Sequence, residues 1–141
     1  MSQSFESSRA PEPVGAFPHA KRVGNLLFLS GIGPRVRGSK DIPGVTLDQA
    51  GVICSYDIEI QTRAVFENVR LVLEDAGATW NDIVDVTVFL TDMKQDFATY
   101  NRIYPEYFAG PGKPNPTRTT VEVGALPTPI AIELKVIAAV A

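Results

Sequence analysis

Two charged side chains stand in the last apolar stretches of the chain and could do chemistry together. Arg118 follows the turn at Pro116 and Thr117, and Glu133 lies within the apolar run 130–137. A planar guanidinium can bind a carboxylate through two parallel hydrogen bonds, which a lysine cannot reproduce. Alternatively, Arg118 is a surface arginine paired with an acid on a neighbouring strand. Its position alone leaves both interpretations open.

The environment of Glu133 decides whether it can transfer protons. In a strand, residues 131, 133, 135 and 137 share one face, so the carboxylate lies opposite the apolar residues 132, 134 and 136. The carboxylate could simply face water beside Lys135. If a partner chain covers this face, burial raises the pKa of the carboxyl from its reference of about 4.3 towards values useful for proton transfer. The sequence leaves these two interpretations open.

Other polar residues carry weaker signals. We expect His19 to be a hydrogen-bonded histidine of the fold rather than a base. The stretch Ser30–Gly33 ends a predicted strand with two glycines, which lets a ligand approach backbone N–H groups or merely makes a bend. On a predicted helix, Asn101, Tyr100 and Tyr104 are expected to pack, and they could line a pocket.

Composition excludes several classes of protein. The 141 residues suit one domain, with the polar residues 1–13 as a flexible arm. No apolar run approaches the roughly 18 residues of a membrane span, and no secretory signal opens the chain, so we expect a cytoplasmic protein. The net charge is −3 with scattered basic residues, which argues against nucleic-acid partners. One cysteine and one histidine exclude an internal disulfide and disfavour a metal or other cofactor site.

Hydrophobic periodicity and turn residues predict an α+β fold. A tight turn at Gly24 and Asn25 separates two strands, and two amphipathic stretches predict helices, the second kinked or ended early by Pro105. The segment 33–52 has no period and is predicted to be a long functional or mobile loop. The predicted strands are 16–23, 26–31, 82–92, 118–123 and 130–140, and the predicted helices are 57–76 and 95–108.

The element order ββαβαββ predicts a mixed sheet with two helices on one face. Helices between strands favour parallel pairing, and the terminal hairpins add antiparallel strands. The other face would leave a partly apolar surface bare in a monomer, formed by Thr87, Phe89, Ala131 and Ile137. Self-association is the simplest way to cover this surface.

Several motifs resemble the RidA/YjgF/UK114 family of reactive imine and enamine deaminases. They are "GAFPHA", "GNLLFLSG", "QTRAVFENVRLVLEDAG", "DIVDVTVFLTDM", "FATYN", "RTTVEV" and "IAIELKVIA", which follow the family order over nearly the whole chain, from Gly15 to Ala138. Within the family, the long segment 35–63 and the stretch 86–108 are most similar to 2-aminomuconate deaminases.

The resemblance implies a chorismate-mutase-like fold and a homotrimer that encloses a barrel of sheets with clefts between subunits, possible also as a hexamer of two trimers. It implies no cofactor. By the family pattern, Arg118 binds the substrate carboxylate and Glu133 handles the water. The positions that match the lining of the family's cleft are Phe17, Ser30, Gly31, Asn101, Tyr104 and Thr120. Phe17 stands where many members have tyrosine, so only packing against the ligand remains for it.

The implied activity is hydrolysis of 2-aminomuconate, a small anionic enamine, to 4-oxalocrotonate and ammonia in the degradation of aromatic compounds. The route passes through an imine and requires no metal. One alternative is a deaminase of broad specificity for 2-imino and enamino acids. Another is a non-catalytic module that binds small acids or acts like a chaperone.

Overall fold

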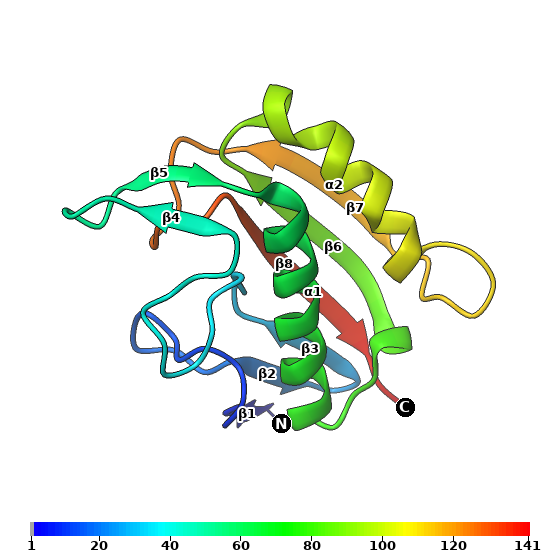
Figure 1. Cartoon of the computed structure of the whole chain (residues 1–141). Helices are drawn as coiled ribbons and strands as arrows, with labels where there is room; N and C mark the ends of the chain where they lie inside the picture. The colour runs from blue at the N-terminus through cyan, green and yellow to red at the C-terminus, as the bar shows by residue number, and fades with distance from the viewer. Residues whose placement is uncertain (1) are drawn as a thin grey trace.

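The main body of the molecule is a six-stranded sheet with two helices on one of its faces (Figure 1). The structure, a computed structural model, describes residues 2–141. Its elements in chain order are β1 (Ser2–Phe5), β2 (Ala20–Val23), β3 (Leu26–Leu29), β4 (Val45–Leu47), β5 (Ile53–Tyr56), α1 (Ile58–Asp75), a 3₁₀ helix (Trp80–Asp82), β6 (Ile83–Leu90), α2 (Met93–Phe108), β7 (Thr117–Glu122) and β8 (Ile132–Ala139). The main sheet has the order β1-β2-β3-β8-β6-β7, and β4 and β5 form a separate sheet.

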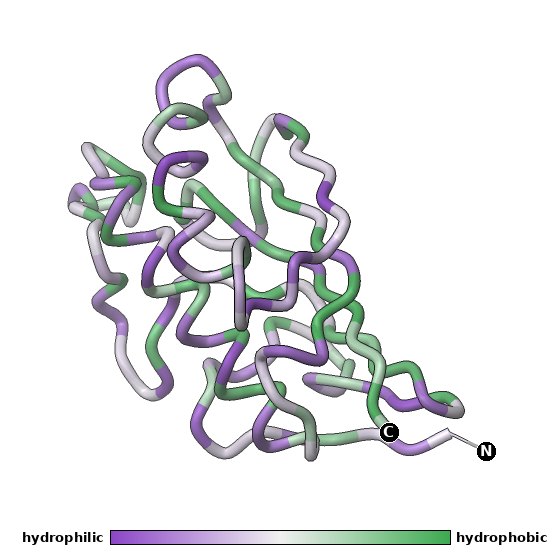
Figure 2. The backbone as a smooth tube through the Cα atoms, turned by 90° about the vertical axis from the view of Figure 1, so that its right-hand side faces the viewer, coloured by the Kyte–Doolittle hydropathy of each residue, from purple (hydrophilic) through white to green (hydrophobic). Residues whose placement is uncertain are grey.

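The main sheet is mixed, as predicted. Strands β6 and β7 are parallel, because α2 carries the chain back between them, and the other neighbouring pairs are antiparallel. Figure 2 shows hydrophobic segments in the layer of strands and many hydrophilic residues in the loops around it. On the helix face the central strands bury Val86, Val88 and Leu90 of β6 and Ile132, Leu134 and Val136 of β8.

Both helices begin at an aspartate cap. The side chain of Asp57 accepts a hydrogen bond from the N–H of Ile60, and that of Asp92 accepts one from the N–H of Gln95. The early end of the second helix that we expected as one outcome at Pro105 is wrong, because α2 continues to Phe108. Pro105 lies in the last turn of α2, where a single backbone hydrogen bond is lost and aromatic packing of that turn compensates for it.

The N-terminal segment differs from the predicted flexible arm. Strand β1 pairs antiparallel with β2, and both Ser7 and Ala10 are buried. The hydroxyl of Ser7 donates to Asp75 Oδ2 at 2.6 Å, and Nη1 of Arg37 donates to the carbonyls of Ser7 and Ala10. These hydrogen bonds, together with the packing of Phe5 and Ala10 against the core, hold the segment, although its composition is mostly polar.

The predicted loop 33–52 is also more ordered than expected. Strand β4 lies inside it and pairs antiparallel with β5. The hydroxyl of Tyr56 donates to Asp96 Oδ2 at 2.6 Å, which joins this hairpin to the first turn of α2. The predicted order ββαβαββ therefore omits three short strands of the structure, β1, β4 and β5, although the predicted fold class is correct.

The sheet face away from the helices carries Phe89 and Ile137, both partly exposed, as predicted. Ala131 does not belong to this face. It is fully buried just before β8, and its N–H donates to Gln61 Oε1 of α1 at 2.8 Å. Neither of the helices within residues 2–141 has the length and apolar character needed to cross a bilayer.

Candidate functional site

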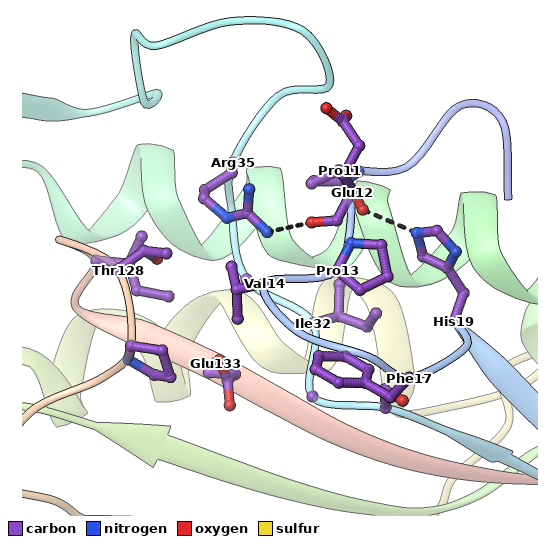
Figure 3. Close-up of a pocket in the computed structure, with 15 residues that line it drawn as sticks. Pro11, Glu12, Pro13, Val14, Phe17, His19, Ile32, Arg35, Thr128 and Glu133 are labelled. Carbon is purple, nitrogen blue, oxygen red and sulfur yellow. Dashed lines mark hydrogen bonds between the residues drawn. The ribbon is translucent and has the colours of Figure 1, made fainter. Parts of the chain in front are cut away.

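A pocket surrounds Glu133 at the start of β8 (Figure 3). The empty space within it measures about 460 Å³, part of which is open solvent at its mouth. Predicted site residues Phe17, Ser30 and Gly31 line it together with Glu133, so the structure brings these four together. The other lining residues are Pro11, Glu12, Pro13, Val14, His19, Ile32, Gly33, Arg35, Pro127, Thr128 and Ile130.

The carboxyl of Glu133 is half-buried in this pocket. Burial raises its pKa above the ordinary value, and the positive charge of Arg35 opposes this change. A carboxyl with a raised pKa exchanges protons closer to neutral pH, which suits a general acid or base. The desolvated environment considered for Glu133 is therefore present within a single chain.

The other predicted residues of this pocket have clear roles. Phe17 is 40% exposed, and its ring offers an apolar wall to a ligand. The hydroxyl of Ser30 donates to the carbonyl of Pro18 at 2.7 Å, so Ser30 fixes the chain where β3 ends. His19 accepts from the N–H of Ser7 at 3.0 Å, and its Nε2 lies 2.8 Å from the carbonyl oxygen of Pro11. His19 is the satisfied histidine that the sequence predicts.

A side chain at Gly31 would meet the end of the Glu133 side chain and force the carboxylate to move. A Cβ at Gly31 would lie 2.6 Å from Glu133 Oε2. We expect Gly31→Ala to displace the carboxylate and to lower kcat by roughly a hundredfold, the scale of a displacement of about 1 Å at a catalytic group. The matched control is Gly124→Ala, because nothing lies within 4 Å of a Cβ there. Equal kcat values for the two purified variants would contradict this expectation.

Arg118 lies in a second group of predicted residues. Its Nη1 donates to Asn101 Oδ1 at 2.9 Å, and its guanidinium carbon is 4.5 Å from the centroid of the Tyr104 ring. The same guanidinium lies over the ring of Tyr100. The hydroxyl oxygen of Tyr100 is 2.9 Å from Thr120 Oγ1. No carboxylate within residues 2–141 forms an ion pair with Arg118, so the alternative of a strand-to-strand salt bridge is wrong for the single chain.

The hydroxyl of Tyr104 has no hydrogen-bond partner in the described part of the chain, although it is buried. Burial raises the pKa of Tyr104 to about 12. The phenol therefore stays protonated at neutral pH and can donate a hydrogen bond to a bound molecule. The Tyr104 hydroxyl lacks a hydrogen-bond partner, and the nearby Arg118 guanidinium lacks a carboxylate partner. This combination indicates a place where an anion or a water completes the network.

The two groups lie on opposite faces of the sheet. Arg118 of β7 pairs laterally with Val86 of β6, which faces the helices. Glu133 of β8 pairs with Phe89, and residues 86 and 89 of one strand point to opposite faces. Within one chain, Arg118 and Glu133 therefore cannot contact the same small ligand.

Sequence reasoning missed one residue that lines the Glu133 pocket and two buried polar residues of α1 that bind backbone groups of nearby segments. Arg35 lines it, and Asn68 of α1 donates from Nδ2 to the carbonyls of Gly33 and Arg35 at 2.8 and 2.7 Å. Gln61 of α1 is fully buried, and besides Ala131 it binds the carbonyl of Pro43 at 3.1 Å. A signal was present, since Gln61 and Asn68 are polar residues about two helical turns apart on the apolar face of α1.

Comparison with known proteins places this geometry in context. The family model described as Endoribonuclease L-PSP matches residues 7–140. A RutC family protein of Pyrococcus abyssi is 41% identical over 133 residues, 94% of this chain and 92% of that protein. TdcF of Escherichia coli K12, whose name proposes a reactive intermediate deaminase, is 33% identical over 138 residues, 98% of this chain and 97% of TdcF.

Solved structures agree with the sequence comparison. The crystal structure of E. coli TdcF with bound serine has a TM-score of 0.83 and 32% identity, and the match covers 99% of each chain. The yjgF gene product of E. coli has a TM-score of 0.81 and 31% identity over 97% of this chain and 98% of that one. The mixed sheet with two helices is thus the fold of these proteins.

Proposed function

Because the chain belongs to the RidA/YjgF family of reactive intermediate deaminases, we propose that it hydrolyses the enamine 2-aminomuconate to 4-oxalocrotonate and ammonia. The observation that carries this proposal is the half-buried carboxyl of Glu133, with its raised pKa, in the wall of a pocket that opens to solvent. The serine bound to TdcF supports a small ligand with an amino group next to a carboxylate.

In this proposal the complete site forms between copies of the chain, with the trimer as the expected assembly. One copy supplies Glu133, Phe17 and Gly31, and its neighbour supplies Arg118 with Asn101, Tyr104 and Thr120. The separation of Arg118 and Glu133 onto opposite faces supports this arrangement, since no single chain can offer both. The partly apolar open face around Phe89 and Ile137 gives the copies a surface to bury.

Each side chain then has a defined task. Arg118 binds the carboxylate next to the amine-bearing carbon, and a proton from solvent adds to the enamine at carbon and gives the protonated imine. Glu133 accepts a proton from the attacking water, whose oxygen bonds to that carbon. The same carboxyl then returns the proton to the nitrogen of the carbinolamine, which leaves as ammonia, and the hydroxyl proton passes to solvent as the carbonyl forms. Orientation and proton transfer account for the rate in this scheme.

The decisive experiment supplies two substrates to the purified protein. One is freshly generated 2-aminomuconate, and the other is a 2-imino monocarboxylate made in place by an amino-acid dehydratase. We expect loss of absorbance together with ammonia release, and a higher kcat/KM for 2-aminomuconate. Similar values for both would favour the broad imine deaminase.

A protein that binds these acids without accelerating ammonia release would instead be a binding module. The name of the matching family model also describes an endoribonuclease. Incubation with single-stranded RNA under the same conditions tests that activity directly. We expect no cleavage, because the chain has a net charge of −3 and scattered basic residues.

A further inference from the structure

We propose that Arg35 is a second anion-binding group of the Glu133 pocket, and that it selects substrates with a second, distal carboxylate. This inference rests on the proposed function and deepens it, because it names the feature of the substrate that the pocket reads. Arg118 of a neighbouring copy would bind the carboxylate beside the reacting carbon, and Arg35 would bind the one at the far end.

The first support is that the Arg35 guanidinium is not engaged by a carboxylate. Within residues 2–141 its side-chain hydrogen bond is a donation from Nη2 to the carbonyl of Glu12 at 2.7 Å. A guanidinium has five N–H donors, so most of its hydrogen-bonding fork remains for a ligand. The arginines that do form ion pairs with carboxylates are Arg9, Arg37, Arg63, Arg70 and Arg102.

The second support is that the backbone around Arg35 is fixed. Both side-chain N–H groups of Asn68, itself buried, bind the carbonyls of Gly33 and Arg35. Glu12, the nearest acid on the N-terminal segment, is turned away from Glu133 in Figure 3, and its Oε1 lies 3.7 Å from Arg37 Nε. Arg37 thus takes the Glu12 carboxylate and leaves Arg35 to the pocket.

The third support is the placement of charge. Figure 3 shows Arg35 and Glu133 on different sides of the pocket, with Phe17 and Val14 among the apolar residues of its wall. No ion pair joins Arg35 to Glu133 within 4.0 Å, although the arginine is near enough to influence the carboxyl. Among the lining residues of the described chain, Arg35 carries the one permanent positive charge.

A competing role is that Arg35 only tunes Glu133. The two roles predict different kinetics. An arginine that tunes Glu133 changes kcat and its pH profile for every substrate. An arginine that binds the distal carboxylate changes KM, and only for dicarboxylates.

The test uses two six-carbon dienoates that differ at the far end, muconate with a second carboxylate and sorbate with a methyl group. We expect calorimetry on the wild-type protein to give tighter binding of muconate. Arg35→Gln should weaken muconate binding by roughly ten- to a hundredfold, the scale of a lost hydrogen-bonded charge pair, and change sorbate binding less than about threefold. Arg35→Lys should recover part of the loss, and Arg22→Gln is the matched control at a partly exposed arginine bonded to the Gly24 carbonyl.

Kinetics complete the test. At a pH above the acidic limb, where Glu133 is deprotonated with or without Arg35, Arg35→Gln should raise KM for 2-aminomuconate by a similar factor and change kcat for a 2-imino monocarboxylate less than about threefold. Equal losses for both ligands, or for both substrates, would overturn the selective role of Arg35 while the deaminase proposal stands. If muconate binding depends on Arg35 but no substrate releases ammonia, the proposed function fails and the dicarboxylate site remains.

Discussion

Glu133→Gln should lower kcat for ammonia release by about 10²–10⁴-fold, the usual contribution of a positioned general acid or base. Gln keeps the shape of the side chain and cannot accept the proton from the attacking water. Binding of muconate should change little, because neither carboxylate of the ligand is assigned to Glu133. Steady-state kinetics and calorimetry on the same preparation measure the two effects separately.

The pH dependence sharpens this prediction. Glu133 must be deprotonated to accept a proton from water, so the rate should rise with pH through its pKa. Burial raises that pKa, and the acidic limb of the kcat/KM profile should therefore lie above the range of an ordinary glutamate. In Glu133→Gln the residual rate should lack this limb.

Stability provides the control for misfolding. A folded-state pKa that is raised means that the contribution of Glu133 is fully favourable below its unfolded pKa and is lost as the pH rises through the folded pKa. Glu133→Gln removes this loss, so its free energy of unfolding at neutral pH should be no lower than that of the wild type. Glu67→Gln, at an exposed glutamate of α1 paired with Arg70, serves as the matched variant for kinetics. A wild-type rate in Glu133→Gln would contradict the catalytic assignment.

The parts of the fold that sequence predicted well are those with a strong local period. The residues of α1 repeat their apolar positions at helical spacing, and its start and end carry Asp57 and a left-handed Gly77. Strands β1, β4 and β5 escaped prediction because each has only a few residues, too few for a period to stand out. Their pairing depends on hydrogen bonds to segments that local pattern does not specify.

The candidate site was predicted in its parts and not in its geometry. Arg118 and Glu133 stand out because they interrupt apolar strands, but their separation depends on β6 lying between β7 and β8. That strand order is a long-range property, and nothing in the local sequence sets it. Arg35 was missed because it lies in a segment without period, where a charged residue is expected to face water.

Complementation between inactive variants should distinguish a site shared by two copies from a site within one chain. Arg118→Gln and Glu133→Gln would each lack one required group in every homo-oligomer. When the two are co-expressed, a shared site can pair Glu133 of one copy with Arg118 of its neighbour. With random mixing, about one half times one half, or about one quarter, of the sites are complete in a closed ring of copies. Two affinity tags on the two variants allow the mixed oligomers to be purified before ammonia release is measured, and in these about one third of the sites of a trimer are complete.

A second mixture, of the wild-type chain with an inactive double variant, tests the shared site by loss of activity rather than by recovery. A double variant carrying Arg118→Gln and Glu133→Gln is co-expressed with the wild-type chain in equal amounts. A shared site again requires two wild-type neighbours, so about one quarter of the wild-type activity per site should remain, whereas a site within one chain would retain about one half. Recovery in the first mixture together with one quarter in the second supports the shared site. No recovery in confirmed mixed oligomers, together with one half in the second mixture, refutes it.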